Sequence, residues 1–344
     1  MNLFRRAAKN PPTMTLEGVL GPNTLLEDAE GRPAPGACAI AIASDGALLV
    51  AQGHDLRRIA DWHAEGEVIH RAAAPIRTLC TSPDGKIAVL CSGGALVVLA
   101  PNFDVAASWP DDTGVAAATD AMFKSESELL ILDGGGHPDD DSLARAAWDD
   151  TMQGSLVSLT SNGSRNVLVD GLHAPVGLCA GMDGLLITQM ERACITDATG
   201  HIVRLGLPGY LGRLRPAPRG YLLSCLARRD PLIEFLKTER AFVDEMKSTI
   251  APAHWIAPRS DPGFSHDFPI EMGATRLFGE VKAWAPSFSY GLVIELDEQL
   301  RPIGSAHSRA NGARHAIAEA IMWQGAMIAV CLGTGELLRM EVQE

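Results

Sequence analysis

Residues 166–225 read NVLVDGLHAPVGLCAGMDGLLITQMERACITDATGHIVRLGLPGYLGRLRPAPRGYLLSC and contain the same short plan twice. In each copy, a loop rich in Gly and Pro leads into an apolar strand, a tight turn and a second apolar strand. The turns fall at Asp183-Gly184 and Arg219-Gly220. Glycine supplies the positive φ of a tight hairpin turn without strain, so each copy predicts a β-hairpin.

The same hairpin pattern recurs in four other places along the chain. Its further turns fall at Asp45-Gly46, Asp84-Gly85, Ser127-Glu128 and Gln324-Gly325. A repeated hairpin indicates a repeat architecture, and turns spaced by about 40 residues match the length of a four-stranded propeller blade. The sequence therefore predicts an all-β fold, a six-bladed β-propeller.

The composition agrees with one globular ring. A chain of 344 residues could hold two average domains, but a single propeller is often that long. Hydrophobic residues make up 47%, which is enough to fill the spaces between blades. No run approaches the roughly 18 apolar residues that would span a bilayer. We expect residues 15–344 to form one domain without a membrane segment, and residues 1–14 to form a mobile arm.

Charge and cysteine content narrow the choice of partners. The net charge of -13 argues against nucleic acid, because binding a phosphate backbone requires a basic face. A small molecule is therefore the expected ligand. No apolar stretch follows the N-terminal positive charges, so no secretory signal is predicted. The cysteines, 7 in number, mostly fall in apolar strand patterns, which favours a reducing cytoplasm.

The N-terminal segment is expected to close the ring. In closed propellers one chain end often supplies an outer strand, which removes the two open sheet edges. Residues 15–20 are the candidate for that strand. In the second unit, residues 95–100 and 104–108 are expected to form the two outer strands.

Two insertions interrupt the repeat. The first, residues 134–150, reads GGGHPDDDSLARAAWDD and predicts a solvated loop. Its run of acids from Asp139 to Asp141 lacks the interleaved spacing of a Ca²⁺ loop, so a metal site there is the less favoured interpretation. The second insertion, residues 230–285, begins with Asp230-Pro231, which predicts an amphipathic helix of about 18 residues. An irregular segment follows it and is expected to cover one face of the ring.

Four short segments and one tryptophan carry a family resemblance. They are LVDGL at 168–172, LPGY at 207–210, YGLVIELD at 290–297, SAHSRANGARH at 305–315, and Trp148 ahead of GSL at 154–156. Together they resemble the strictosidine synthase-like proteins of the wider senescence-marker/gluconolactonase superfamily. The resemblance covers roughly residues 37–342, and it implies a six-bladed propeller whose site lies at the mouth of the central channel.

The resemblance also implies a metal site, most of whose ligands are missing here. Metal-dependent lactonases of the superfamily have a Glu, an Asn and an Asp-Asn pair at the positions that match Ala37, Val176 and Gly212-Arg213. Only Asp120 remains of that ligand set. Since Ca²⁺ takes about six to eight oxygen ligands, one carboxylate does not make a site. We therefore expect no metal cofactor.

A second catalytic group of the family is also displaced. The plant strictosidine synthases use a glutamate of the sixth blade as general acid/base, and Ala318 matches that position. Glu319 is the next residue. Because strand side chains alternate between two faces, a shift of one residue in register decides whether Glu319 faces the channel.

Several polar residues remain at the expected channel mouth. His315 or Glu319 is the candidate general base, since a histidine titrates near neutral pH. Arg213 is the candidate for binding a carboxylate or stabilising an oxyanion. The alternative for Arg213 is that it pairs with Asp120 and plugs the channel. The candidate substrate-binding residues are Asp120, His173, Arg77 and Trp284.

Three functions stay open at this level. The first is hydrolysis of a lactone or related ester in the central channel, without the usual divalent metal. The second is non-catalytic binding of a small molecule, or an accessory role beside a partner enzyme. The third is a lyase or cyclase that acts on a biosynthetic intermediate. A serine hydrolase is disfavoured because no Gly-x-Ser-x-Gly turn surrounds the candidate serines, such as Ser308.

Overall fold

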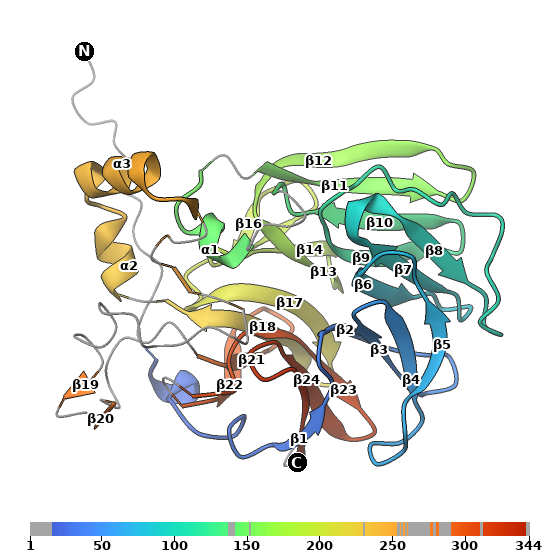
Figure 1. Ribbon diagram of the computed structural model, residues 1–344, viewed down its shortest axis with the longest axis horizontal. Helices are drawn as coiled ribbons and strands as arrows, with labels where there is room; N and C mark the ends of the chain where they lie inside the picture. The colour runs from blue at the N-terminus through green and yellow to red at the C-terminus, as the bar shows by residue number, and fades with distance from the viewer. Residues whose placement is uncertain are drawn as a thin grey trace.

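The chain forms a ring of β-sheets with few helices, which confirms the six-bladed propeller (Figure 1). The computed structural model describes residues 16–136, 142–150, 153–229, 231–252, 255, 257–258, 260, 276–277, 280–281, 290–309 and 312–341. In the described part, the first strand of each blade contacts the first strand of the next, and the sixth contacts the first. The first strands therefore surround the axis of the ring.

Each blade is an antiparallel sheet whose strands follow one another outward. Blade one contains β2 Ala37–Ile42, β3 Leu48–Gln52, β4 Asp55–Ile59 and β5 Glu67–Arg71; blade two contains β6 Ile76–Thr81, β7 Ile87–Cys91 and β8 Leu96–Leu99. Blade three contains β9 Ala118–Ser125, β10 Glu128–Asp133, β11 Gln153–Thr160 and β12 Arg165–His173; blade four contains β13 Pro175–Gly181, β14 Gly184–Gln189, β15 Cys194–Asp197 and β16 Ile202–Arg204. Blade five contains β17 Gly209–Ala217, β18 Gly220–Arg228, β21 Leu292–Leu296 and β22 Pro302–His307; blade six contains β23 Ile317–Trp323, β24 Ala326–Cys331, β25 Glu336–Glu341 and β1 Glu30–Pro33. A separate two-stranded sheet contains β19 Arg276–Leu277 and β20 Glu280–Val281.

The hairpin turns that defined the repeat join the first and second strands of the blades, as the sequence predicted. Five of these turns contain a glycine with positive φ, which explains why glycine recurs there. They are Gly46, Gly85, Gly184, Gly220 and Gly325.

The N-terminal segment closes the ring, as expected, but with a later strand than the one predicted. Strand β1 pairs antiparallel with β25, and Figure 1 shows this blue strand beside the red strands of the C-terminus. The candidate strand at 15–20 is wrong, because Gly18–Leu20 forms a 3₁₀ turn, η1. Gly18 has a φ of 59°, which an extended strand does not adopt.

Blade two has three strands in the described structure rather than four. Residues 104–108 make only an isolated bridge, between Val105 and Leu99. The chain turns directly after β8, where Phe103 has a φ of 66°. The expected fourth strand is therefore wrong. A second 3₁₀ turn, η2 Ser92–Gly94, joins β7 to β8.

The insertion in blade three was predicted to be a solvated loop, but its second half forms a short buried helix. Helix α1, Ser142–Ala146, buries Leu143, and Trp148 after it is 4% exposed. Both pack in one apolar cluster with Tyr210 of β17. The apolar half, LARAAW, thus covers the ring, whereas Asp139 to Asp141 lie outside the described residues.

The insertion in blade five contains two short helices instead of one long helix. They are α2, Pro231–Leu236, and α3, Arg240–Thr249. The break lies at Thr238, whose hydroxyl donates a hydrogen bond to the carbonyl oxygen of Phe235 at 2.7 Å. Such local hydroxyl bonds compete with helix continuation. Figure 1 shows α1, α2 and α3 gathered on one side of the molecule.

The apolar core lies between the blades. Each pair of neighbouring blades encloses its own cluster of buried residues, and a further cluster joins the three helices to the ring. Burial of this kind stabilises the ring at each blade boundary. In the described part of the chain, no helix is long and apolar enough to cross a membrane.

Blade five holds a buried neutral histidine beside the N-terminal segment. The Nδ1 atom of His307 lies 2.9 Å from the Tyr290 hydroxyl, and its Nε2 atom lies 2.8 Å from the Ser305 hydroxyl. Ser305 donates its own proton to the carbonyl oxygen of Val19. Nε2–H therefore donates to Ser305, and Nδ1 accepts from Tyr290. Burial, with the nearby charge of Arg228 second, lowers the pKa of His307 to about 4.

We expect the stability of the protein to fall as the pH drops from about 6.5 to about 4, the range between the unfolded and folded pKa values of His307. In that range the unfolded imidazole binds a proton and the folded one does not, so protons favour the unfolded chain. Urea unfolding of wild type and of His307→Gln across this pH range measures how much His307 contributes to the pH dependence of the unfolding free energy. The variant should lose less stability on acidification than wild type, and equal losses would contradict the assignment.

We also expect Leu26→Ala to destabilise the protein by about 2–5 kcal/mol, since a buried leucine is lost and a cavity remains. Leu26 is 0% exposed and packs between blades five and six, just before β1. The neighbouring Leu25 is 50% exposed, so Leu25→Ala is a matched control that should change stability by less than about 0.5 kcal/mol. Equal unfolding free energies for the two variants would show that this segment does not anchor the ring.

Candidate functional site

The first strands bring four charged side chains together at the axis of the ring. Asp120 comes from β9, Arg213 and Arg215 come from β17, and Glu319 comes from β23. Both carboxylate residues are 0% exposed, and Arg213 is 6% exposed. Buried charges are stable only when they are paired and hydrogen-bonded, so the partners of each group decide what it can do.

The Arg213 guanidinium uses all of its N–H groups inside the protein. Nη1 donates to the carbonyl oxygen of Cys38 at 2.8 Å and to Oε2 of Glu319 at 3.0 Å. Nη2 donates to the carbonyl oxygens of Arg77 at 3.1 Å and of Thr119 at 2.8 Å, and Nε donates to Thr119 at 3.2 Å. A guanidinium has five N–H donors, so none is left for a substrate oxygen.

Arg215 completes the cluster on the same strand. It donates two hydrogen bonds to the Asp120 carboxylate, both 2.7 Å long, and its Nε donates to Oε1 of Glu319 at 2.5 Å. The backbone N–H of Leu178 donates to Asp120, and that of Ile40 donates to Glu319, each at 2.8 Å. With the contacts of Arg213, the cluster reaches the first strand of every blade.

The charges in this cluster balance. Burial favours the neutral form of Asp120, but the guanidinium groups of Arg215 and Arg213 and the Leu178 N–H outweigh it and lower the pKa of Asp120. Burial likewise opposes the charge on Arg215, yet Asp120 and Glu319 raise the pKa of Arg215 well above its ordinary value. Two cations therefore face two carboxylates.

The sequence anticipated only part of this arrangement. The alternative interpretation, in which Arg213 pairs with Asp120, is present at 3.6 Å, but the stronger partner of Asp120 is Arg215, which sequence reasoning missed. The available signal was strand alternation, since residues 213 and 215 of one strand share a face. Glu319 faces the axial cluster, and Ala318 lines a neighbouring pocket.

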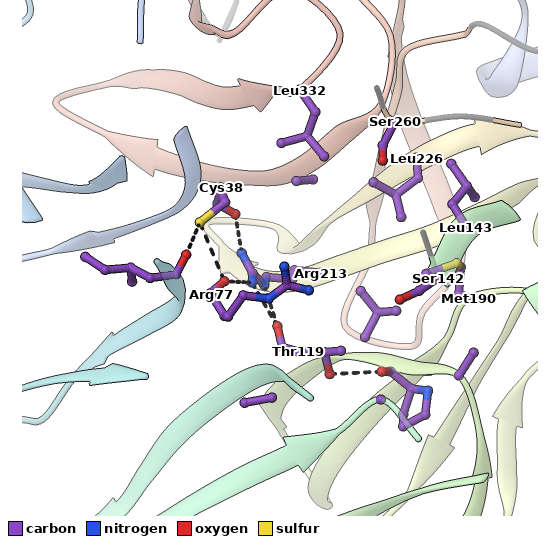
Figure 2. A pocket seen from close by; sticks show the side chains of 17 residues that line it. Cys38, Arg77, Thr119, Ser142, Leu143, Met190, Arg213, Leu226, Ser260 and Leu332 are labelled. Carbon is purple, nitrogen blue, oxygen red and sulfur yellow. Dashed lines mark hydrogen bonds between the residues drawn. The ribbon is translucent and has the colours of Figure 1, made fainter. Parts of the chain in front are cut away.

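A pocket of about 260 Å³ lies at the mouth of the channel, with Arg213 in its wall (Figure 2). Its described lining is mostly small and apolar and contains no carboxylate or imidazole. The lining residues are Cys38, Ile76, Arg77, Ala118, Thr119, Gly134, Ser142, Leu143, Ala174, Pro175, Val176, Met190, Arg213, Leu226, Ser260, Ala318 and Leu332.

Two lining residues differ sharply in what they offer a ligand. The Arg77 guanidinium is half-buried, and no hydrogen bond or ion pair to it is formed within the described structure. The Cys38 thiol donates to the carbonyl oxygen of Ile76 at 3.2 Å. Burial raises the pKa of Cys38, and the opposing charges of Arg213 and Arg77 do not offset this, so Cys38 is a protonated thiol. Of these two residues, Arg77 is the one with free hydrogen-bonding capacity.

Helix α1 covers one side of this pocket, and α2 and α3 pack with it in one apolar cluster; we call the three helices the roof. Leu143 of α1 lines the pocket and belongs to the same apolar cluster as Trp148. The Trp148 and Phe242 rings lie 6.2 Å apart and join α1 to α3. Directly after α2, Lys237 forms an ion pair with Glu191, the second residue after β14. The roof is thus fixed to the ring by apolar packing and by charge.

A second balanced group of charges reinforces the base of the roof. Arg229, 1% exposed, lies 3.2 Å from the Glu234 carboxylate and donates to the carbonyl oxygen of Glu191 at 2.6 Å. Burial opposes ionisation of Glu191, but Lys237 and Arg229 outweigh it and lower its pKa. Here too, two cations meet two carboxylates.

The histidines proposed from the sequence lie away from the pocket lining. His173 is buried, with Nε2 3.0 Å from the carbonyl oxygen of Asp149. His315 is buried, with Nδ1 3.0 Å from the carbonyl oxygen of Ala313. Trp284 lies outside the described residues. The structure therefore brings together Arg77, Arg213, Asp120 and Glu319, and it does not add either histidine to them.

The positions that the family resemblance matches to metal ligands carry no ligand side chains. They are Ala37, Val176 and Gly212. The carbonyl oxygen of Gly212 accepts a hydrogen bond from the Thr188 hydroxyl at 2.8 Å. Over the part of the chain that the structure describes, no group of three His, Cys, Asp or Glu residues is placed to hold a metal ion.

Comparison with solved structures places the fold among known propellers. A gluconolactonase-family protein superposes with a TM-score of 0.51 at 11% identity, over 91% of this chain and 92% of its own. Regucalcin from Agrobacterium tumefaciens, a calcium-binding protein, gives 0.42 at 14% identity, over 57% and 71%. A chain of the nidogen/laminin complex gives 0.43 at 13% identity, over 56% and 73%. No family model and no curated protein matches the sequence. The first of these likenesses supports a gluconolactonase-like fold, and the strictosidine synthase-like assignment stays a prediction.

We expect Asp120→Asn to destabilise the protein by about 3–5 kcal/mol, because it leaves the buried Arg215 charge without its bidentate partner. Urea unfolding at neutral pH measures the loss. The matched control is Glu295→Gln, which removes a carboxylate paired with the exposed Arg219. That control should cost less than about 1 kcal/mol. Similar losses for the two variants would show that the axial cluster contributes no more than a surface ion pair.

Proposed function

We propose that this propeller binds one small organic molecule in the pocket at the mouth of the channel, without a resident divalent cation. The observation that carries the proposal is the Arg213 guanidinium, whose five N–H groups are all used at the axis beneath an apolar pocket of about 260 Å³. Concave, mostly apolar pockets with a few convergent polar groups are the usual form of small-molecule sites.

The filled axis supports the metal-free part of the proposal. In a metal-dependent lactonase a cation polarises the substrate carbonyl and activates water. Here Arg213 and Arg215 supply the positive charge near the axis, and their carboxylate partners Asp120 and Glu319 are already ion-paired. A divalent ion would have to displace a guanidinium that bonds to four blades.

Hydrolysis of a lactone or ester is a second candidate function, supported by the gluconolactonase-like fold over 91% of the chain. Water would add to the carbonyl carbon, and the ring C–O bond would break to give a hydroxy acid. Arg77 would stabilise the carbonyl oxygen, because the donors of Arg213 are used. Binding without turnover is nevertheless the better supported function, because the described lining supplies no general base.

Each residue that the sequence proposed as a general base would have to change its contacts or position before it could accept a proton from water or substrate. Glu319 would need to release Arg213 and Arg215, which hold both of its oxygens. His315 would need to reach a substrate from outside the pocket lining. The strictosidine synthase-like proposal meets a similar requirement, because Ala318, at the matched acid/base position, lines the pocket without a proton to transfer.

The test is a panel of small lactones, assayed for binding and for hydrolysis with and without a chelator. We expect binding to survive chelation, because positive charge at the axis comes from arginine. Val176→Trp should abolish it by filling the pocket. Hydrolysis that survives chelation would establish the second candidate function.

The matched control for this test is Val167→Trp, which adds the same bulk on the outer strand β12, where Val167 is 57% exposed. If the Val176→Trp and Val167→Trp variants bind the ligand equally well, the ligand binds outside this pocket. Binding or turnover that a chelator abolishes and Ca²⁺ or Zn²⁺ restores would contradict the metal-free proposal.

A further inference from the structure

Arg77 gives the mouth pocket a chemical selectivity that its fold does not specify. We infer that the pocket takes molecules with one carboxylate and a compact apolar body, and that Arg77 binds the carboxylate. This inference rests on the proposed function, since it names the class of ligand for the same pocket. It also excludes polyhydroxylated sugar lactones as good ligands.

The charge argument begins with the two balanced groups around the pocket. At the axis, Arg213 and Arg215 face two carboxylates, and beneath the roof, Arg229 and Lys237 face two more. Arg77 belongs to neither group. Its guanidinium lines the pocket, while its carbonyl oxygen accepts from Arg213 at 3.1 Å. The described lining therefore carries one uncompensated positive charge and no carboxylate.

A guanidinium in this state favours a carboxylate over other ligand groups. Its planar fork of donors matches the two oxygens of a carboxylate, and such charge-assisted hydrogen bonds are stronger than neutral ones. The half-buried position of Arg77 weakens competition from water. Because the whole protein carries a net charge of -13, the attraction comes from this local cation and not from the overall charge.

The rest of the described lining offers little to hydroxyl groups. The Thr119 hydroxyl already donates to the carbonyl oxygen of Pro175 at 2.9 Å, and the Cys38 thiol already donates to Ile76. Ser142 and Ser260 are the remaining hydroxyls of the described lining. A sugar lactone would bury several hydroxyls without partners, which weakens binding.

The dimensions of the pocket suit one substituted ring. A cavity of about 150 Å³ lined by apolar side chains holds benzene, so 260 Å³ accommodates a ring with a short side chain. Figure 2 shows Arg77 beside Cys38 and Thr119, and Leu143, Met190 and Leu226 together on the other side of the view. The carboxylate would therefore bind at Arg77, and the apolar body would pack against the leucine and methionine side chains.

The experiment compares matched pairs of compounds by isothermal titration at neutral pH. The probes are benzoate, phenylacetate, 3-phenylpropionate and cyclohexanecarboxylate, each paired with its neutral primary amide. Glucono-1,5-lactone and γ-valerolactone complete the panel. We expect at least one carboxylate to bind tenfold or more tightly than its amide and than glucono-1,5-lactone.

Two substitutions assign that preference to Arg77. Arg77→Met keeps an apolar side chain of similar reach and removes the charge, so it should reduce the carboxylate-to-amide ratio to about one. Arg77→Lys restores a point charge without the planar fork and should recover part of the ratio. Thermal unfolding of both variants checks that they fold, and Arg58→Met, on the outer strand β4, is the control for loss of a positive charge.

Each outcome separates this inference from the proposed function. Equal binding of carboxylates and amides, or a ratio that Arg77→Met leaves unchanged, overturns the carboxylate preference. Tight binding of glucono-1,5-lactone overturns the apolar preference. In either case, if Val176→Trp abolishes binding, the pocket at the mouth of the channel remains the binding site and the proposed function stands. If Val176→Trp weakens the binding of no compound in the panel, both the inference and the proposed function are overturned.

Discussion

The axial cluster of Asp120, Arg213, Arg215 and Glu319 is the constraint on which the ring depends. Removing four charges from water carries a large desolvation cost, and it is tolerated only where every charge finds partners. No single blade could supply those partners. Backbone carbonyl or N–H groups from the first strands of blades one to four pair with the charges that blades three, five and six supply, so the cluster is satisfied only when the ring is closed. The electrostatics at the axis and the topology of the fold therefore depend on each other.

This arrangement separates two kinds of arginine at the channel. Arg213 and Arg215 are internal cross-links, with donors that end on backbone carbonyls and carboxylates. Arg77 contributes its carbonyl oxygen to the same network but leaves its guanidinium in the pocket. Arg213 and Arg215 therefore stabilise the ring, whereas the Arg77 guanidinium is available to a ligand. A buried position and a positive charge alone do not distinguish these roles, whereas the hydrogen-bond partners do.

The roof and the pocket share their side chains. Leu143, Met190 and Leu226 line the pocket and also belong to the cluster that holds the three helices on the ring. A molecule in the pocket would extend that apolar cluster, so binding and docking of the roof are thermodynamically linked. The insertions in blades three and five, which interrupt the repeat, add Ser142, Leu143 and Ser260 to the wall of a pocket that the strands of the ring otherwise form.

The sequence by itself determined the six hairpins, the blade order and the sites of the insertions, because turn glycines and alternating apolar residues are local signals. It also placed Arg213 near Asp120. Only the tertiary structure showed that Arg215 is the main partner of Asp120, that Glu319 faces the axis, and that Arg77 keeps free donors in the pocket. Those facts depend on contacts between residues that are roughly 100 positions apart in the chain, which local periodicity does not encode.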